Sequence, residues 1–98
     1  MASTYIILVN WTDQGLKSVR ESASRLDAAK KAIGSMGGRF VSFFLTMGEY
    51  DLVAVCEAPD DEAMARFSLG LARQGNVRAK TLKAFPEETY RKIIAEAP

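Results

Sequence analysis

The chain has 98 residues, with 13 lysines and arginines, 12 aspartates and glutamates, one cysteine and no histidine. This length suits one domain, which we expect over residues 1–98. A net charge of +1 gives no bulk attraction to nucleic acid or an anionic membrane. The missing histidine excludes metal, haem and triad chemistry that depends on imidazole. A lone cysteine excludes an intrachain disulfide.

Apolar residues in the first third of the chain predict a strand and a helix. Residues Thr4 to Trp11 are apolar on both faces, which is typical of a central strand. A period of three to four residues then predicts one long helix from about Leu16 to Met36, ended by Gly37-Gly38. Capping-box spacing at Ser18 also permits a short turn and a later start. The expected buried stripe is Leu16, Val19, Ala23, Leu26, Ala29, Ile33 and Met36.

The stretch from Arg39 to Glu57 predicts a β-hairpin, because it is rich in aromatic and β-branched residues. Its expected turn is Gly48-Glu49-Tyr50-Asp51, where glycine permits a positive φ and the aspartate bonds nearby backbone amides. Strict alternation places Val41, Phe43, Leu45 and Met47 on one face of the first strand. It places Phe40, Ser42, Phe44 and Thr46 on the other.

The rest of the chain predicts a helix, a strand and a short helix. Pro59 and Asp60 end one element and cap the next, whose buried stripe is Ala63, Met64, Phe67 and Leu71. Residues Val77 to Phe85 read as an edge strand, because lysine discourages unwanted pairing there. Pro86 opens the last helix, which has an apolar side.

This order, βαββαβ plus a C-terminal helix, predicts an α+β ferredoxin-like fold. Two helices cover one face of its four-stranded antiparallel sheet and leave the other face open. Apolar side chains from the first three strands occupy that face, and such a patch is rare on a soluble monomer. We therefore expect a homodimer or a higher homo-oligomer packed through the sheet. The alternative is that the C-terminal helix folds back over the open face.

The segment Met47-Gly48-Glu49-Tyr50-Asp51-Leu52-Val53 resembles the GYD domain family, and the resemblance extends to Glu57 through Asp61 and to Gly75 through Phe85. That family comprises small bacterial and archaeal proteins without an established activity. The resemblance implies a ferredoxin-like fold of the dimeric α/β-barrel type. The chain is also similar, at the level of fold, to the ligand-binding domain of Lrp/AsnC-type regulators. It lacks their helix-turn-helix, so direct DNA binding is not expected.

Six residues form the candidate ligand site: Gly48, Tyr50 and Asp51 of the hairpin turn, Asn10 and Trp11 at the end of the first strand, and Arg39 at the start of the hairpin. Arg39 would meet an anionic ligand together with Arg20 and Arg25 if the three converge. In this interpretation Tyr50 donates a hydrogen bond and Asp51 accepts one at the mouth of a pocket. The structural alternative is that Asp51 caps its own turn while Tyr50 packs over the hairpin or at a subunit contact. Trp11 and Asn10 end the first strand beside the first helix, where a cleft between sheet and helices often holds ligands.

Three functions are compatible with this residue set. The first is an oligomeric module that binds a small molecule or a protein partner. The second is a cofactor-independent monooxygenase- or isomerase-like enzyme, with Phe40, Phe44 and Trp11 lining an apolar cavity and Tyr50 or Asp51 handling protons. The third is a structural assembly protein with a filled core. No apolar run approaches the roughly 20 residues that span a bilayer, so we expect a cytoplasmic protein without metal or cofactor.

Overall fold

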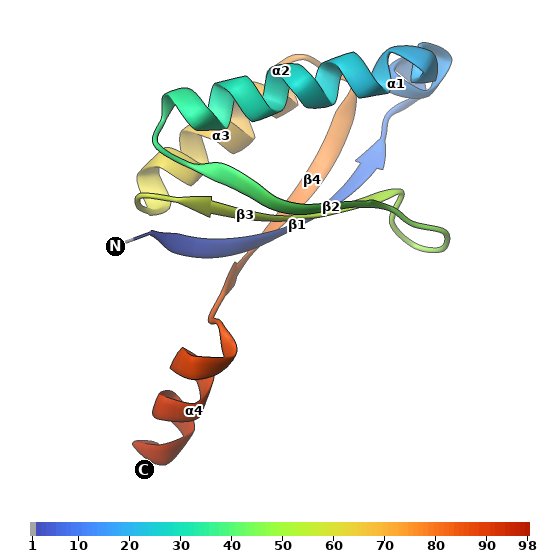
Figure 1. The fold of residues 1–98 in the computed structure, drawn as a ribbon. Helices are drawn as coiled ribbons and strands as arrows, with labels where there is room; N and C mark the ends of the chain where they lie inside the picture. The colour runs from blue at the N-terminus through green and yellow to red at the C-terminus, as the bar shows by residue number, and fades with distance from the viewer. Residues whose placement is uncertain (1) are drawn as a thin grey trace.

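The computed structural model describes residues 2–98, which form four strands and a set of helices (Figure 1). The strands are β1 (Ser3–Trp11), β2 (Arg39–Leu45), β3 (Leu52–Ala58) and β4 (Val77–Ala84). The helices are α1 (Asp13–Lys17), the 3-10 turn η1 (Val19–Glu21), α2 (Ser22–Ser35), α3 (Asp61–Arg73) and α4 (Glu87–Ala95). None of the helices within residues 2–98 has the length and apolarity needed to cross a membrane.

The strands form one antiparallel sheet in the order β2-β3-β1-β4, with α2 and α3 on the same face. This is the predicted ferredoxin-like arrangement. Strand β1 is central because it pairs with both β3 and β4, as its two apolar faces indicated. Strand β4 is an edge strand, also as predicted. The helix layer and the sheet therefore enclose the core between them.

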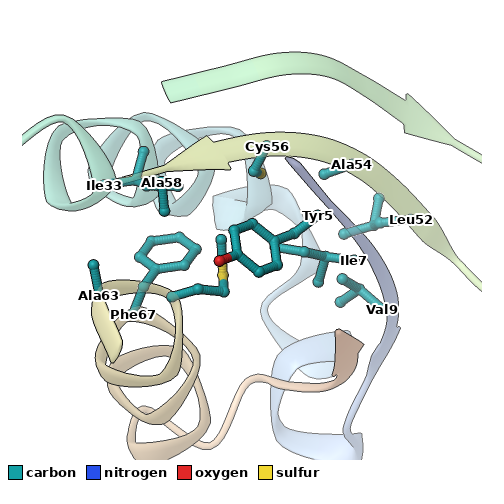
Figure 2. Close-up of a cluster of buried hydrophobic side chains, with 11 residues drawn as sticks. Tyr5, Ile7, Val9, Ile33, Leu52, Ala54, Cys56, Ala58, Ala63 and Phe67 are labelled. Atoms are coloured by element: carbon teal, nitrogen blue, oxygen red, sulfur yellow. The ribbon is translucent and has the colours of Figure 1, made fainter. Parts of the chain in front are cut away.

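The core lies on the helix side of the two central strands (Figure 2). Tyr5, Ile7 and Val9 point into it from β1, and alternate residues of β3 join them. Helix α3 contributes the predicted stripe, of which Ala63, Met64 and Phe67 are fully buried. Asp60 caps this helix, since its carboxylate accepts a hydrogen bond of 2.9 Å from the Ala63 amide.

A single helix from Leu16 is wrong in its N-terminal third, where the structure has the alternative, a later start with short turns before it. The chain forms α1 and η1 before α2 begins at Ser22, so the break at Ser18 changes the phase of the helical pattern. Leu16 and Val19 are consequently exposed, and Ile33 is the one buried residue of α2. Its end is as expected, because Gly37 adopts a φ of +84° and reverses the chain.

The predicted alternation along β2 is also wrong. A bulge between Phe40 and Ser42 shifts the register, so that Phe40 lies opposite Cys56 and Phe43 lies opposite Ala54. Both aromatic rings therefore face the helices, because Cys56 and Ala54 are core residues. The expected tight turn is in fact a loop of residues 46–51, since β2 ends at Leu45 and β3 begins at Leu52.

The opposite face of the sheet carries no helix (Figure 1). Its apolar side chains are Ile6, Leu8, Phe44, Val53, Val55 and Leu82, which we call the open face. Phe44 and Leu82 are about half exposed. Helix α4 does not fold back to cover these residues; it stands away from the sheet, and its Tyr90, Ile93 and Ile94 are exposed. The alternative cover considered from the sequence is therefore not adopted within this chain.

Candidate functional site

The loop of residues 46–51 is fastened to the end of β1 through Asp51. The Asp51 carboxylate accepts a hydrogen bond of 2.9 Å from the backbone N–H of Trp11. The Asp51 N–H donates to the Val9 carbonyl at 2.9 Å and to the Asn10 side-chain oxygen at 3.1 Å. The side chain thus joins two distant segments. The structural alternative, in which Asp51 caps its own turn, is not what the hydrogen bonds show.

The loop closes on itself through Thr46 instead. Its backbone N–H donates to the Asp51 carbonyl at 2.8 Å, and its hydroxyl donates to the Tyr50 carbonyl at 2.6 Å. Gly48 lies at the tip with a φ of +124°, and no atom lies within 4 Å of the position a Cβ would occupy. Gly48 therefore serves the backbone conformation of the loop.

Three of the candidate residues, Asn10, Trp11 and Tyr50, line one hollow at this end of the sheet. Arg78 and Lys80 of β4 line it with them, because Arg78 lies opposite Asn10 and Lys80 lies opposite Leu8. The Lys80 ammonium sits 5.8 Å from the centre of the Tyr50 ring. Sequence reasoning missed these two cations, since only the register between β1 and β4 brings them to the loop.

Arg39 lies apart from the other candidates. It begins β2 and pairs with Glu57 at the far end of β3, where its Nε lies 2.9 Å from the carboxylate. The whole length of β2 separates it from the loop at Asp51. The structure therefore brings Asn10, Trp11, Tyr50 and Asp51 together and leaves Arg39 outside this group.

A second hollow, which we call the helix cleft, lies between α2, α3 and the sheet. Its volume is about 190 Å³. Trp11, Phe40 and Phe43 line it, whereas the expected Phe44 lies on the open face because of the bulge in β2. Helix α2 presents mainly small side chains to it, and α3 contributes Phe67, Gly70 and Leu71. The cleft therefore matches the apolar cavity of the enzymatic alternative, except that Phe43 takes the place of Phe44.

The cleft wall also contains polar groups, among them the Trp11 indole and two arginines. The indole Nε1 of Trp11 is buried and has no hydrogen-bond partner among residues 2–98. An unpartnered buried donor costs about 1–3 kcal/mol of folding free energy. Such groups are rare in folded proteins, and a functional role is one explanation for them. Arg25 and Arg66 also line the cleft, and no aspartate or glutamate of the described chain does so.

A third polar cluster joins β1, α3 and β4, and no pattern in the sequence indicated it. The Tyr5 hydroxyl donates to the Asp61 carboxylate at 2.5 Å, and the Lys83 ammonium donates to the same oxygen at 2.6 Å. Lys83, and then Tyr5, lower the pKa of Asp61. Burial, and then the Asp61 hydrogen bond, raise the pKa of Tyr5, while Asp61 raises the pKa of Lys83. None of the three lines either of the two hollows described above, and their hydrogen bonds fasten α3 to β1 and β4.

Cys56 is fully buried in the core, and burial raises the pKa of its thiol to about 11. It is therefore held as the neutral thiol at physiological pH, which does not favour nucleophilic chemistry. Across residues 2–98 no three aspartate, glutamate, cysteine or histidine side chains gather closely enough to hold a metal ion.

The family model for the GYD domain matches residues 5–94, nearly the whole chain. The chain belongs to the GYD domain family. One relative, from Thermus thermophilus, is named "Glutamine synthetase and cystathionine beta-lyase binding protein". The two sequences are 34% identical over 84 residues, which is 85% of this chain and 88% of the relative.

Two solved structures share the fold of this GYD domain. A crystal structure of a Thermus thermophilus protein matches with a TM-score of 0.52 and 25% identity, covering 85% of this chain and 92% of the other. A crystal structure of a hypothetical protein from Pyrococcus horikoshii matches with a TM-score of 0.54 and 18% identity, covering 87% and 90%. These matches confirm the ferredoxin-like arrangement expected from the sequence.

Proposed function

We propose that this GYD domain is a homo-oligomeric module that binds other proteins. The observation that carries the proposal is the open face, an apolar sheet surface left uncovered by the chain's own helices. Contiguous apolar surface of this kind marks interaction sites on soluble proteins. Binding through such a surface needs neither an activated nucleophile nor a cofactor.

Self-association is the first part of this function. The open face presents apolar side chains from all four strands, so a second copy provides a surface of matching chemistry. Two copies packed face to face around a twofold axis bury both surfaces in one isologous contact. This arrangement is the dimeric α/β-barrel type.

Helix α4 supports the same assembly. It projects on the side of the sheet opposite α2 and α3 (Figure 1). Its Ile93 and Ile94 are exposed, as is Phe85 just before it. An amphipathic helix of nine residues is marginal in water by itself, because its stability comes from packing its apolar side. A neighbouring copy within reach of α4 provides that packing.

Native mass spectrometry and light scattering of three proteins test the assembly. The wild-type protein is expected to be a dimer or a larger oligomer. Leu82→Glu places a charge in the open face and is expected to give monomers, because burying an unpaired carboxylate is costly. Leu69→Glu is the matched control: Leu69 is an exposed α3 residue that belongs neither to the open face nor to the helix cleft. A monomeric wild-type protein, or equal dissociation by both variants, contradicts the proposal.

Protein partners are the second part of the function. The relative from Thermus thermophilus supports this, because its name records binding to glutamine synthetase and cystathionine beta-lyase. We therefore propose a metabolic enzyme of this kind as the partner. Biolayer interferometry tests the idea, with this protein and the purified glutamine synthetase and cystathionine beta-lyase of the organism that encodes it. Saturable binding of either enzyme is expected; the absence of binding to both, with an intact oligomer, removes this part of the proposal.

The other two functions receive less support. The enzymatic alternative assigned proton handling to Tyr50 or Asp51, and neither residue lines the helix cleft. The purely structural alternative expected a filled core, whereas the cleft leaves about 190 Å³ between the layers. The interaction module is compatible with both observations.

A further inference from the structure

The helix cleft lies on the face of the sheet opposite the surface used for self-association, so its role is independent of the proposed assembly. We propose that the cleft binds a small monocarboxylic acid, with its apolar body between the layers and its carboxylate at the arginines of the rim. The proposal rests on the volume of the cleft, on its charge and on one glycine.

The volume and lining define the apolar body of this ligand. A dry cavity of about 150 Å³ in another protein accepts benzene, and the helix cleft has about 190 Å³. Trp11, Phe40 and Phe43 give its sheet side an aromatic wall, and Ala29 and Ala32 leave space on the α2 side. A body of one six-membered ring or a short aliphatic chain therefore fits.

The charge of the lining defines the polar group. Arg25 and Arg66 are the charged residues that line the cleft within the described chain, and no carboxylate accompanies them there. Arg25 is held in place by its own hydrogen bonds, which it donates to the carbonyls of Ser18 and Gly15 at 3.2 Å. Arg66 is exposed, and among residues 2–98 its guanidinium forms an ion pair only with the Glu62 carboxylate, at 3.8 Å. Its guanidinium is thus available, and guanidinium groups bind carboxylates with two parallel hydrogen bonds.

Gly70, an exposed residue, leaves the α3 side of the cleft without a side chain at this position. It stands in the middle of a helix, where glycine is about 1 kcal/mol less favourable than alanine. It lines the cleft, and no atom lies within 4 Å of the position that its Cβ would take. A larger side chain therefore has room there but would occupy the space proposed for the ligand.

The experiment uses benzoate as the probe and follows the indole N–H signal of Trp11 in ¹⁵N-edited NMR. Trp11 is the single tryptophan of the chain, so its indole gives one signal. Because Trp11 lines both hollows, the variants of cleft residues described below assign the binding to the helix cleft. Benzoate is expected to move this signal in a saturable manner. Benzamide has nearly the same shape without the charge, and acetate has the charge without the ring. Benzamide is expected to bind about tenfold more weakly than benzoate, because a charge-assisted pair is lost. Acetate is expected to leave the signal unmoved.

Two pairs of variants locate the binding. Arg66→Gln is expected to weaken benzoate binding about five- to tenfold, whereas Arg73→Gln, on the same helix but outside the cleft, leaves it unchanged. Gly70→Leu is expected to abolish binding. Gly34→Leu is its control, because Gly34 also has open space around its Cβ position but does not line the cleft.

Three results overturn the proposal. If benzoate does not move the signal, the cleft does not bind it. Equal affinities for benzoate and benzamide would show that the cleft does not recognise the carboxylate. Benzoate binding that survives Gly70→Leu in a folded protein places the ligand elsewhere. These results leave the oligomeric state untouched, so failure here is distinguishable from failure of the proposed function.

Discussion

The Asp51 carboxylate and the Trp11 backbone N–H, 40 residues apart in sequence, meet at 2.9 Å. This hydrogen bond fixes the loop of residues 46–51 to the last residue of β1. Because the Trp11 side chain also lines the helix cleft, Asp51 positions one wall of that cavity. The residue thus links the hairpin, the central strand and the candidate binding site.

Asp51→Ala is therefore expected to destabilise the protein by about 1–2 kcal/mol, since a hydrogen bond to a charged acceptor is lost and a part-buried N–H is left without its partner. Urea unfolding curves measure the change. Asp51→Asn keeps an acceptor oxygen and is expected to lose less. Glu49→Ala, in the exposed part of the same loop, serves as the control. A neutral Asp51→Ala would mean that the bond contributes nothing to folding.

Tyr50→Phe is expected to leave stability within about 0.5 kcal/mol of the wild type, because the ring that Lys80 contacts is retained. Tyr50→Ala removes the ring and is expected to cost more, by roughly 0.5–1 kcal/mol for an exposed cation–π pair. Thermal melts of the two variants give the comparison. A Tyr50→Phe protein as unstable as Tyr50→Ala would assign the contribution to the hydroxyl.

The Cys56 thiol is expected to be unreactive toward a disulfide reagent at pH 8 in the native protein. It is fully buried, and burial raises its pKa to about 11, so little thiolate forms and the reagent has no access. The same thiol should react fully in urea. Labelling of the folded protein at the rate of a free thiol would show that the core opens around β3.

Asp61 is expected to make stability fall at acid pH. Lys83 and Tyr5 lower its folded pKa below the unfolded value of about 4. Its contribution is therefore complete above that unfolded value and is lost as the pH falls through the lower folded value. The raised pKa values of Lys83 and Tyr5 act in the opposite direction, so their contributions are present below about pH 10 and are lost at higher pH.

Urea midpoints measured from pH 2 to 7 for the wild type and Asp61→Asn test this. The difference between the two proteins should be constant above about pH 5 and should shrink as the pH falls below about 4. Glu62→Gln provides the control from the same first helical turn, because the ion pair that Glu62 makes with Arg66 is long and exposed. A difference that does not change with pH would exclude the carboxylate charge as its cause.

Gly15→Ala and Gly34→Ala are expected to change stability in opposite directions. A Cβ on Gly15 would collide with the backbone of Asn76, which cannot move easily, so a loss of about 1–3 kcal/mol is expected. Gly34 belongs to α2, and a Cβ there would meet open space. The higher helix propensity of alanine should therefore raise the free energy of unfolding by about 0.5–1 kcal/mol. Thermal unfolding of both variants measures the two signs; a stabilised Gly15→Ala would show that α1 can move away from Asn76.

Local sequence patterns were enough to predict the order of the elements, the central position of β1 and the stripe of α3. Alternation and helical periodicity are local, and so are the caps at Asp60 and Gly37. The bulge in β2 depends on tertiary contacts instead, whereas the break at Ser18 had a local signal in its capping-box spacing. One extra residue against a partner strand leaves almost no trace in local composition.

For the candidate site, too, the sequence predicted some features and not others. Trp11, Tyr50 and Asp51 were all candidates from the sequence, but the hydrogen bond that joins Asp51 to Trp11 was not predicted. Arg78 and Lys80 reach the loop only through the register of β4 on β1, and Tyr5, Asp61 and Lys83 meet only where α3 docks on the sheet. Strand register and helix docking are set by contacts between residues far apart in the chain. Only the tertiary structure shows these contacts.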